Sequence, residues 1–409
     1  MKCRHCETPL KHTVLDLGSA PPSNAYLTAD DLARPEITYP LEIKVCDRCW
    51  LVQTEDFAQA DELFRPDYAY FSSTSTTYLA HAARYAEEIT QRLQLNNRSM
   101  VIEVASNDGY LLKNFVAAGI PCLGIEPTES TAEVAEGLGI PVVREFFGLE
   151  LGRRLAVEGQ QADLVAGNNV YAHVPDINDF TRGLGAALRP GGTITLEFPH
   201  VMRLLEHNQF DTVYHEHFSY LSLFTVRRIF EAVGLRVWDV EELPIHGGSL
   251  RIYGCHADDP RKTAPTVDGL VEEEHDRGLQ TLAPYRGFQA RAEKVRDDLL
   301  GFLNEQKMRG KTVAAYGAAA KGNTLLNFAG VTPDLLPFVC DAAEAKQGKY
   351  LPGSRISILP PSALEQESPD FVLILPWNIA DEVRQQNAEL VGRGTRFVRA
   401  IPRLEVFSS

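Results

Sequence analysis

The sequence predicts an α/β protein in which two strand–turn–helix units follow a small cysteine-bearing unit. The first observation is Val101-Ile-Glu-Val-Ala-Ser-Asn-Asp-Gly109, an apolar run that breaks into small and polar residues before a helix-like stretch at 110–115. The second is Lys311-Thr-Val-Ala-Ala-Tyr-Gly317, which breaks in the same way before residues 318–324. The third is a pair of Cys-x-x-Cys motifs near the start of the chain. Such turns lie where α/β sheets bind nucleotide-like ligands.

The size and charge of the chain limit the classes of function. Its 409 residues are enough for two to three domains that each bury a core. The net charge of −15 argues against a nucleic-acid or anionic-membrane surface, although a local basic pocket for one phosphorylated small molecule remains compatible with it. Because no signal segment or membrane-spanning apolar run is present, we expect a cytoplasmic protein, and the acidic surface favours a monomer.

Residues 1–62 form the first expected unit, which contains both Cys-x-x-Cys pairs. Two such pairs bring four thiolates together tetrahedrally, as zinc requires in a closed structural site. The alternatives are disulfides, which a cytoplasmic chain disfavours, and a redox Cys-x-x-Cys, which a second pair fits less well than a metal does. We therefore predict that structural Zn²⁺ staples this segment, and that its ligands are Cys3, Cys6, Cys46 and Cys49. The single cysteines Cys122, Cys255 and Cys340 lie in apolar segments and are expected in the core.

The second expected unit spans residues 63–257 and opens with a loop rich in Tyr, Ser and Thr, followed by an amphipathic helix at 78–95. A polar aromatic loop just before the first buried strand suits a lid over a sugar, with Tyr68 and Tyr70 as the substrate-binding candidates. A surface loop that joins two domains would have the same composition. The sequence does not decide between these two interpretations.

Four strand-end motifs then follow in a fixed order. They are Glu103 with the loop at 105–109, Glu126 after an apolar run, Asn168 after another, and Leu188-Arg-Pro-Gly-Gly-Thr-Ile-Thr-Leu196. Parallel strands are expected at 101–105, 122–126, 163–167 and 193–198, with an antiparallel-edged pair at 235–240 and 250–255. The ordered set resembles the motifs of class I methyltransferases that use S-adenosylmethionine. The G-x-G-x-x-G of the rival NAD-binding fold is absent.

That resemblance implies a role for each strand-end residue. Asp108 and Gly109 are expected at the methionine end of the cofactor, Glu126 at its ribose and Asn168 at its amino acid end. The loop departs from the usual glycine-rich pattern, because alanine and asparagine occupy the first two glycine positions. Phe146 or Phe147 would contact the adenine, unless both pack in the core. The predicted cofactor-binding residues are Glu103, Ala105, Asn107, Asp108, Gly109, Glu126, Phe146 and Asn168.

Two clusters of titratable side chains fall where the chemistry of this unit would take place. One contains His173, and the other is Asp211-Thr-Val-Tyr214-His-Glu-His217-Phe-Ser-Tyr220. If the second cluster is extended, Tyr214 and Glu216 share one face while His215 and His217 share the other. The His-x-His pair would suit a metal site or two surface histidines. We favour a general base with supporting hydrogen-bonding groups, because histidine titrates near working pH.

The third expected unit, residues 258–409, begins with charged helical sequence and continues with the second strand–turn–helix motif. Small residues at 317–320 let a ligand approach the backbone, helix N–H groups face an anion, and Lys321 adds a positive charge. Because the glycine-lysine-serine ending of a P-loop is absent, ATP hydrolysis is not implied. We predict a Rossmann-like unit that binds a phosphate-bearing substrate, with a purely structural Rossmann-like domain as the alternative.

The whole chain resembles the nucleotide-sugar C-methyltransferases of deoxysugar pathways. The resemblance lies in the cysteine pairs, Ser106-Asn-Asp-Gly109, Tyr214-His-Glu-His217, His246-Gly-Gly-Ser-Leu-Arg251 and Gly317-x-x-x-Lys321-Gly-Asn-Thr324, in that order. That family methylates a ring carbon, commonly C-3, of a dTDP-linked 4-keto-6-deoxysugar. The resemblance implies that His217 is the base, that Tyr214, Glu216 and His173 surround the sugar, and that Lys321, Asn323 and Thr324 hold the nucleotide diphosphate.

Other functions remain open at this stage. An O-methyltransferase for a small hydroxylated acceptor would keep the cofactor site but would not need an enolate. C-5 methylation of a related nucleotide sugar would keep the enolate and move the methyl group. A zinc-binding module with a decayed core would bind no cofactor, but intact Glu103, Asp108, Gly109 and Glu126 argue against decay.

Overall fold

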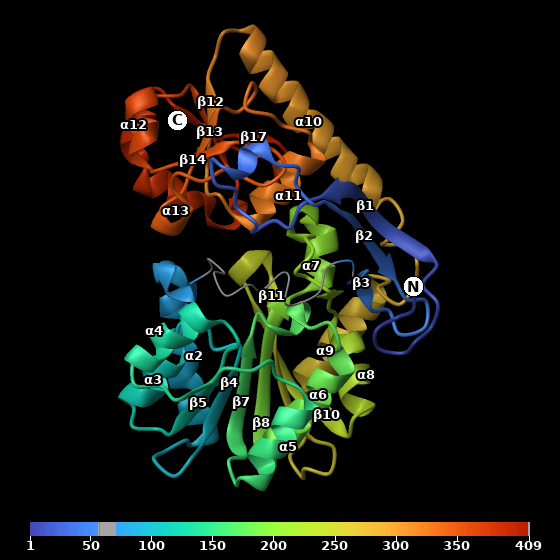
Figure 1. The fold of residues 1–409 in the computed structure, drawn as a ribbon. Helices are drawn as coiled ribbons and strands as arrows, with labels where there is room; N and C mark the ends of the chain where they lie inside the picture. Colours follow the sequence, from blue (N-terminus) through green and yellow to red (C-terminus); the bar gives the residue numbers. More distant parts are fainter. Residues whose placement is uncertain (56, 58–70, 408–409) are drawn as a thin grey trace.

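The computed structural model describes residues 1–55, 57 and 71–407, which form three sheets and the helices around them (Figure 1). In Figure 1 the second sheet lies at the bottom, the third unit at the top, and the strands of the first unit at the side. Tyr68 and Tyr70, the two predicted lid residues, lie outside the described residues. None of the helices in the described part of the chain is long and apolar enough to cross a membrane.

The first sheet is antiparallel and takes its last strand from the second unit. Its strands, in spatial order, are β1 (His12–Ala20), β2 (Tyr39–Val45), β3 (Val52–Thr54) and β9 (Ser219–Tyr220). Val52 of β3 pairs with Tyr220, and Gln53 pairs with Ser219. The first unit is therefore completed by a strand that lies immediately after the Tyr-His-Glu-His motif. The sequence did not predict this pairing.

The second sheet contains the four predicted parallel strands at its centre and the predicted antiparallel pair at one edge. Its order is β10-β11-β8-β7-β4-β5-β6, and β11 is antiparallel to both of its neighbours. The strands are β4 (Val101–Val104), β5 (Cys122–Ile125), β6 (Val142–Val143), β7 (Ala162–Asn168), β8 (Leu188–Pro199), β10 (Leu235–Leu243) and β11 (Ser249–His256). The strand order reverses between β4 and β7, where α/β sheets bind ligands outside the carboxyl ends of the strands.

Helices cover both faces of the second sheet (Figure 1). They are α2 (Thr76–Leu93), α3 (Leu112–Ala117), α4 (Glu129–Gly137), α5 (Leu149–Val157), α6 (Ile177–Ala187), α8 (Leu223–Glu231) and α9 (Pro265–Asp276), while α7 (Val201–Glu206) lies above the sheet in Figure 1. Neighbouring strand residues point to opposite faces, so Val101 packs in the cluster with Tyr85 of α2 and Phe115 of α3, while Ile102 joins the main core. The near-continuous apolar strands of the sequence are explained by this double cover.

The third sheet is parallel except for its last strand, as expected of a Rossmann-like unit. In spatial order its strands are β14 (Ser357–Leu359), β13 (Phe338–Cys340), β12 (Val313–Tyr316), β15 (Phe371–Ile374), β16 (Arg396–Arg399) and β17 (Glu405–Val406). The helices of this unit are α10 (Phe288–Met308), α11 (Ala320–Phe328), α12 (Ser362–Glu367), α13 (Ala380–Gln386) and α14 (Ala388–Gly392). Cys122, Cys255 and Cys340 are buried, which confirms their predicted place in the core.

The first unit also contacts the third unit directly. Helix α10 extends down to β1, where the side-chain oxygen of Gln289 accepts a hydrogen bond from the Asp16 N–H at 2.8 Å (Figure 1). The segment after β1 lies among the elements of the third unit, and Leu27 exchanges two backbone hydrogen bonds of 2.9 Å with Tyr350. The zinc-bearing unit thus touches both of the other two.

Candidate active site

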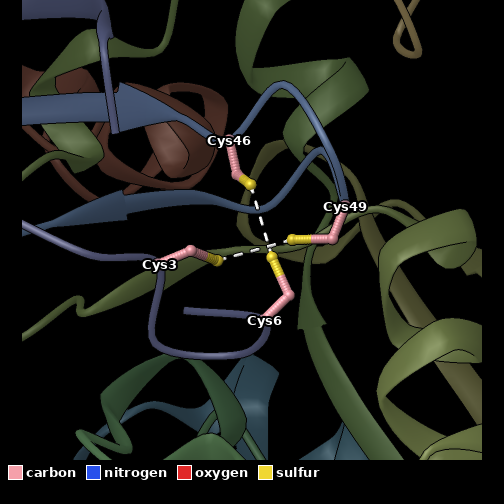
Figure 2. A group of neighbouring side chains, drawn as sticks. All are labelled: Cys3, Cys6, Cys46 and Cys49. Carbon is pink, nitrogen blue, oxygen red and sulfur yellow. Dashed lines mark hydrogen bonds between the residues drawn. The ribbon is translucent and has the colours of Figure 1, made fainter. Parts of the chain in front are cut away.

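The four predicted zinc ligands lie together in the first unit, two of them before β1 and two between β2 and β3 (Figure 2). The Sγ atoms of Cys3 and Cys49 are 3.4 Å apart, those of Cys6 and Cys46 are 3.6 Å apart, and all four lie within 4.8 Å of one another. This spacing suits a tetrahedral ion with Zn–S bonds of about 2.3 Å. The four sulfurs form a closed set that fits structural Zn²⁺.

The loop at 105–109, which we call the cofactor loop, leaves β4 at the point where the strand order reverses. Ala105, Asn107 and Gly109 have φ values of 57°, 49° and 77°, in the left-handed region. A Cβ atom on Gly109 would lie 2.5 Å from Cδ1 of Ile140, so only glycine fits there. The alanine and asparagine at the usual glycine positions therefore adopt the backbone that glycine would adopt.

Glu126, which follows β5, holds the cofactor loop in place. Its Oε2 accepts the N–H of Asn107 and its Oε1 accepts the N–H of Thr128, both at 2.9 Å. The side chains of Asn107 and Asp108 accept backbone N–H groups of Ser72 and Ser73 at 2.9 and 3.0 Å. Each carboxylate oxygen of Glu126 keeps a lone pair that a ribose hydroxyl can use.

Buried polar atoms beside this loop indicate a polar ligand. Three side-chain atoms have no hydrogen-bond partner among the residues that the structure describes: Nδ2 and Oδ1 of Asn168, and Oδ1 of Asp108. Since buried polar atoms normally find partners, the two strand ends fit the amino, carboxylate and hydroxyl groups of S-adenosylmethionine. Glu103 is fully buried in β4, and burial raises the pKa of its carboxyl well above the ordinary value.

The two phenylalanines that were candidates for adenine contact separate in the structure. Phe147 packs against Phe180, with ring centroids 5.3 Å apart, and so belongs to the core. Phe146 is 56% exposed and is the one of the two that remains free to contact an adenine. Its role stays a prediction.

The Tyr-His-Glu-His segment is a tight turn. The N–H of His217 donates to the carbonyl of Tyr214 at 2.9 Å, and the two rings are in contact, with centroids 3.9 Å apart and planes tilted by 33°. The segment is therefore not extended, so the arrangement that an extended segment would give, with Tyr214 and His217 on opposite faces, does not occur. Glu216 and His217 are 2% and 8% exposed, and His215 is buried as well, so the histidines are not surface residues.

One tautomer of His217 is fixed by its surroundings. Nδ1 lies 2.8 Å from the carbonyl oxygen of Thr212, in the short helix η4 (Phe210–Thr212). Because a carbonyl only accepts, Nδ1 carries the proton and Nε2 has a free lone pair. Burial, assisted by the neighbouring His173, lowers the pKa of His217 well below its ordinary value. The imidazole is therefore neutral at physiological pH.

His173 and His217 come together, as the sequence placed them in one site. His173 ends the short helix η3 (Tyr171–His173), and its ring centroid lies 4.6 Å from that of His217 in an edge-on arrangement. Burial lowers the pKa of His173 to about 4, although a hydrogen bond to the backbone of Glu216 works in the opposite direction. Both rings are thus neutral groups in a low-dielectric environment.

The first unit holds the Tyr-His-Glu-His turn from outside. Thr54 of β3 donates through its hydroxyl to the carbonyl of His217 at 3.3 Å and through its N–H to that of Phe218 at 3.2 Å. His215 contacts the carbonyl of Tyr39 at 3.2 Å, so it points away from His217. Within the described residues the four cysteines form the one group suited to a metal, which leaves the His-x-His metal alternative without support.

Lys321 is half-buried, and its charge helps to lower the pKa of His217. Its Nζ donates to Oδ1 of Asn378 at 3.0 Å and lies 4.7 Å from the ring centroid of Trp377. Trp377 in turn donates to Oδ2 of Asp211 at 2.7 Å. Burial lowers the pKa of Lys321 and raises that of Asp211 to about 6, and each charge partly offsets the shift of the other.

Asn323 joins the third unit to the first, and Thr324 joins it to the second. Asn323 Nδ2 donates to the carbonyl of Ser23 at 2.7 Å, and the Thr324 hydroxyl donates to the carbonyl of Val213 at 3.0 Å. Both side chains are almost fully buried. Because these donors already bind chain carbonyls, the geometry favours a joining role over the predicted contact with a diphosphate.

No role was predicted from the sequence for Glu197, a charged residue near the end of β8. Glu197 is fully buried and accepts a hydrogen bond from Arg251 at 2.7 Å, while His81 of α2 lies 2.9 Å away. Arg251 also lies over the ring of Tyr85 at 4.2 Å. A signal was present, because Glu197 stands in an otherwise apolar strand, but its partners are distant in sequence.

Known protein families match this chain along its length. Three family models match in succession: a zinc binding domain over residues 3–64, a methyltransferase domain over 78–240 and a C-methyltransferase C-terminal domain over 244–402. C-methyltransferase NovU of Streptomyces niveus is 36% identical over 408 residues, covering 100% of this chain and 97% of NovU. This chain belongs to the C-methyltransferase family. It is a methyltransferase that uses S-adenosylmethionine and carries a four-cysteine zinc site.

Solved structures align with parts of the C-methyltransferase at low scores. The PH0226 protein of Pyrococcus horikoshii OT3 is 13% identical, covers 46% of this chain and 95% of its own, and has a TM-score of 0.38. A SAM-dependent methyltransferase of Anabaena variabilis ATCC 29413 is 17% identical, covers 43% and 84%, and has a TM-score of 0.35. The family assignment rests on the sequence matches.

Proposed function

We propose that this C-methyltransferase methylates a ring carbon, C-3, of a dTDP-linked 4-keto-6-deoxysugar through an enolate. The observation that carries the proposal is His217, a buried neutral imidazole whose Nδ1 is held by Thr212 beside Tyr214 and His173. Carbon must lose a proton before it can act as a nucleophile. A carbon next to a ketone is acidic enough for a positioned histidine to remove that proton.

In the proposed reaction His217 is the general base. Its Nε2 takes the proton from C-3, and the electron pair of the broken C–H bond moves towards the ketone oxygen to give the enolate. Tyr214 and His173 are the proposed donors to that oxygen, and Glu216 completes the surroundings of the sugar. S-adenosylmethionine supplies the electrophilic methyl group when it is bound. The low pKa of His217 makes it a weak base. Preorganised hydrogen-bond donors to the enolate oxygen therefore supply much of the stabilisation of the enolate.

The proposed binding residues lie in two units, the cofactor site in the second and the diphosphate site in the third. We assign the cofactor to residues around the cofactor loop: Glu103, Ala105, Asn107, Asp108, Gly109, Glu126, Phe146 and Asn168. We assign the diphosphate to Lys321, whose charge acts on His217, and we assign the joining of the units around it to Asn323 and Thr324. The proposed units are residues 1–62, 63–257 and 258–409, acting as a monomer.

The test is deuterium wash-in. The protein is incubated in heavy water with dTDP-4-keto-6-deoxysugars and S-adenosylhomocysteine, and the ring protons are read by NMR. Exchange confined to C-3 is the expected result. Exchange at C-5 alone would overturn the assigned carbon and keep the substrate class. With cofactor binding confirmed, a lack of enzyme-dependent exchange would overturn the enolate mechanism on these sugars.

A further inference from the structure

The segment at residues 21–27, which we call the bridging segment, connects the zinc-bearing unit to both of the other units. It follows β1 and lies among the elements of the third unit (Figure 1). The Ser23 carbonyl accepts Nδ2 of Asn323 at 2.7 Å, and the Tyr26 hydroxyl donates to the carbonyl of Ala318 at 2.6 Å. With the Leu27–Tyr350 backbone pair, these contacts fix the segment on the third unit at three points.

Between these anchors one side chain of the bridging segment reaches the second unit. Nδ2 of Asn24 donates to Oε1 of Glu216 at 2.8 Å. Asn24 is partly buried and Glu216 is 2% exposed, so this hydrogen bond is largely shielded from water. In the sequence Glu216 lies between Tyr214 and His217, whose rings are in contact in the Tyr-His-Glu-His turn.

We propose that Asn24 is a positioning residue of the methylation site, which holds the carboxylate of Glu216 in place from the zinc-bearing unit. This inference rests on the proposed function, because it takes Glu216 to be part of the sugar site. An amide donor at hydrogen-bond distance stabilises the ionised carboxylate and fixes its direction. Asn24 does not itself touch the reacting atoms; it acts through Glu216.

The backbone around Asn24 supports a fixed rather than an incidental contact. The Tyr26 N–H donates to the Asn24 carbonyl at 3.0 Å, and the Ala25 N–H donates to the carbonyl of Pro22 at 3.0 Å, so the segment is turned at this residue. Lys346 donates to the same Ala318 carbonyl as Tyr26, at 3.0 Å, and forms an ion pair with Asp341 at 3.5 Å. The donor of Glu216 is therefore placed by residues of the third unit.

A double-mutant cycle tests the proposal. Asn24→Ala removes the donor and is expected to lower turnover by ~10-fold, the scale of one hydrogen bond to a charged group, without changing the affinity for S-adenosylhomocysteine. In a Glu216→Gln background the same substitution should have no further effect, because its partner is already altered. Asn24→Asp, which keeps the size but places two carboxylates together, should shift the pH profile of turnover towards higher pH.

Thr28→Ala is the matched control. Thr28 lies on the same stretch of chain, is exposed and binds Asp31, so its loss perturbs the loop without touching Glu216. Its turnover should match that of the unaltered protein. Equal losses in Asn24→Ala and Thr28→Ala, or additive losses in the double mutant, would overturn the proposal.

Crystal structures of the unaltered and Asn24→Ala proteins give a readout that does not depend on the substrate. The Glu216 carboxylate is expected to move or to occupy several positions in the variant. An unmoved carboxylate would refute a positioning role for Asn24. If the unaltered protein neither exchanges nor methylates the sugars, the proposed function fails instead, and the crystal structures still decide the contact.

Discussion

The second and third sheets begin with the same local geometry. In the second, the N–H of Ser106 donates to the carbonyl of Ile125 at 3.1 Å, and Glu126 accepts the N–H of Asn107 at 2.9 Å. In the third, the N–H of Gly317 donates to the carbonyl of Cys340 at 2.7 Å, and Asp341 accepts the N–H of Ala318 at 2.7 Å. In both, a carboxylate after the second strand holds the loop after the first.

The two loops differ in what fills them. Beside the cofactor loop the described residues leave Asn168 and one oxygen of Asp108 without partners. At the loop of the third sheet the chain supplies the partners: Tyr26 and Lys346 bind the Ala318 carbonyl, and Pro376 packs against Gly317. A strand–turn–helix motif therefore does not by itself identify a ligand site. The difference lies in whether the rest of the chain satisfies its polar groups.

The largest effect is expected from removal of zinc, because the zinc-bearing unit supplies Tyr26 to the loop of the third sheet and Thr54 to the Tyr-His-Glu-His turn. Cys49→Ser, or chelation of the intact protein, should abolish methyl transfer while S-adenosylhomocysteine still binds at the second sheet. Structural zinc contributes about 10 kcal/mol in small zinc units, so its loss should release both contacts.

Metal content, thermal unfolding and calorimetric binding measure the outcome. Cys255→Ala, at a buried cysteine outside the site, is the control. Full turnover without zinc would contradict the comparison.

His217→Ala should lower turnover by at least ~100-fold, because a general base contributes on that scale. Cofactor binding should be unchanged, since the cofactor loop is separate from the turn that carries His217. Initial rates and calorimetry measure the two quantities on one preparation. His215→Gln is the matched control, because this neighbouring histidine faces Tyr39 and should keep turnover within ~10-fold. A His217 variant with near-normal turnover would place the base elsewhere.

A pair of matched variants tests the two loops against each other. Glu126→Ala should weaken cofactor binding by ~10- to 100-fold, the worth of hydrogen bonds to a charged group. Asp341→Ala should leave cofactor binding intact and lower the free energy of unfolding by about 3 kcal/mol, because it leaves the half-buried Lys346 and two backbone N–H groups without their carboxylate. Calorimetry and urea unfolding separate the effects. If Asp341→Ala weakened cofactor binding as much, the two loops would not differ as described.

The smallest expected effect is a pH dependence of stability. Burial lowers the pKa values of His173 and His246 to about 4, so between pH 4 and 6.5 the unfolded chain binds more protons than the folded one. Stability from these groups is present above pH 6.5 and is lost as the pH falls. Burial lowers the pKa values of His215 and His217 as well, so these two act in the same direction. Asp211, with its pKa raised to about 6, and Glu103, with its pKa raised well above the ordinary value, have the opposite sign. The four histidines outnumber the two carboxyls.

The free energy of unfolding should therefore fall by about 2 kcal/mol from pH 7 to pH 5, the scale of one to two pKa units. Urea titrations at several pH values measure this slope. His246→Gln should make the slope shallower, because it removes one of the shifted groups. A slope that is flat in the unaltered protein, or the same in the variant, would mean that the histidines are not buried as neutral groups.

The sequence by itself determined the elements whose signals are local. The strand that carries Glu103 and the strand that precedes Glu126 follow from apolar runs, and the cofactor loop follows from the break after β4. The zinc site follows from cysteine spacing, because a Cys-x-x-Cys turn places two sulfurs on one side regardless of the surrounding fold. Backbone propensity and short spacing decide such features, so neighbours in sequence are sufficient.

The tertiary structure decided the contacts between residues far apart in the chain. The segment Tyr214–His217 forms a turn, and β9, which follows it, joins the first sheet. The contact between Asn24 and Glu216 and the ion pair of Arg251 with Glu197 join distant parts of the chain. Such pairs leave no periodic trace in the sequence, because each partner is read as an isolated polar residue until packing brings the two together.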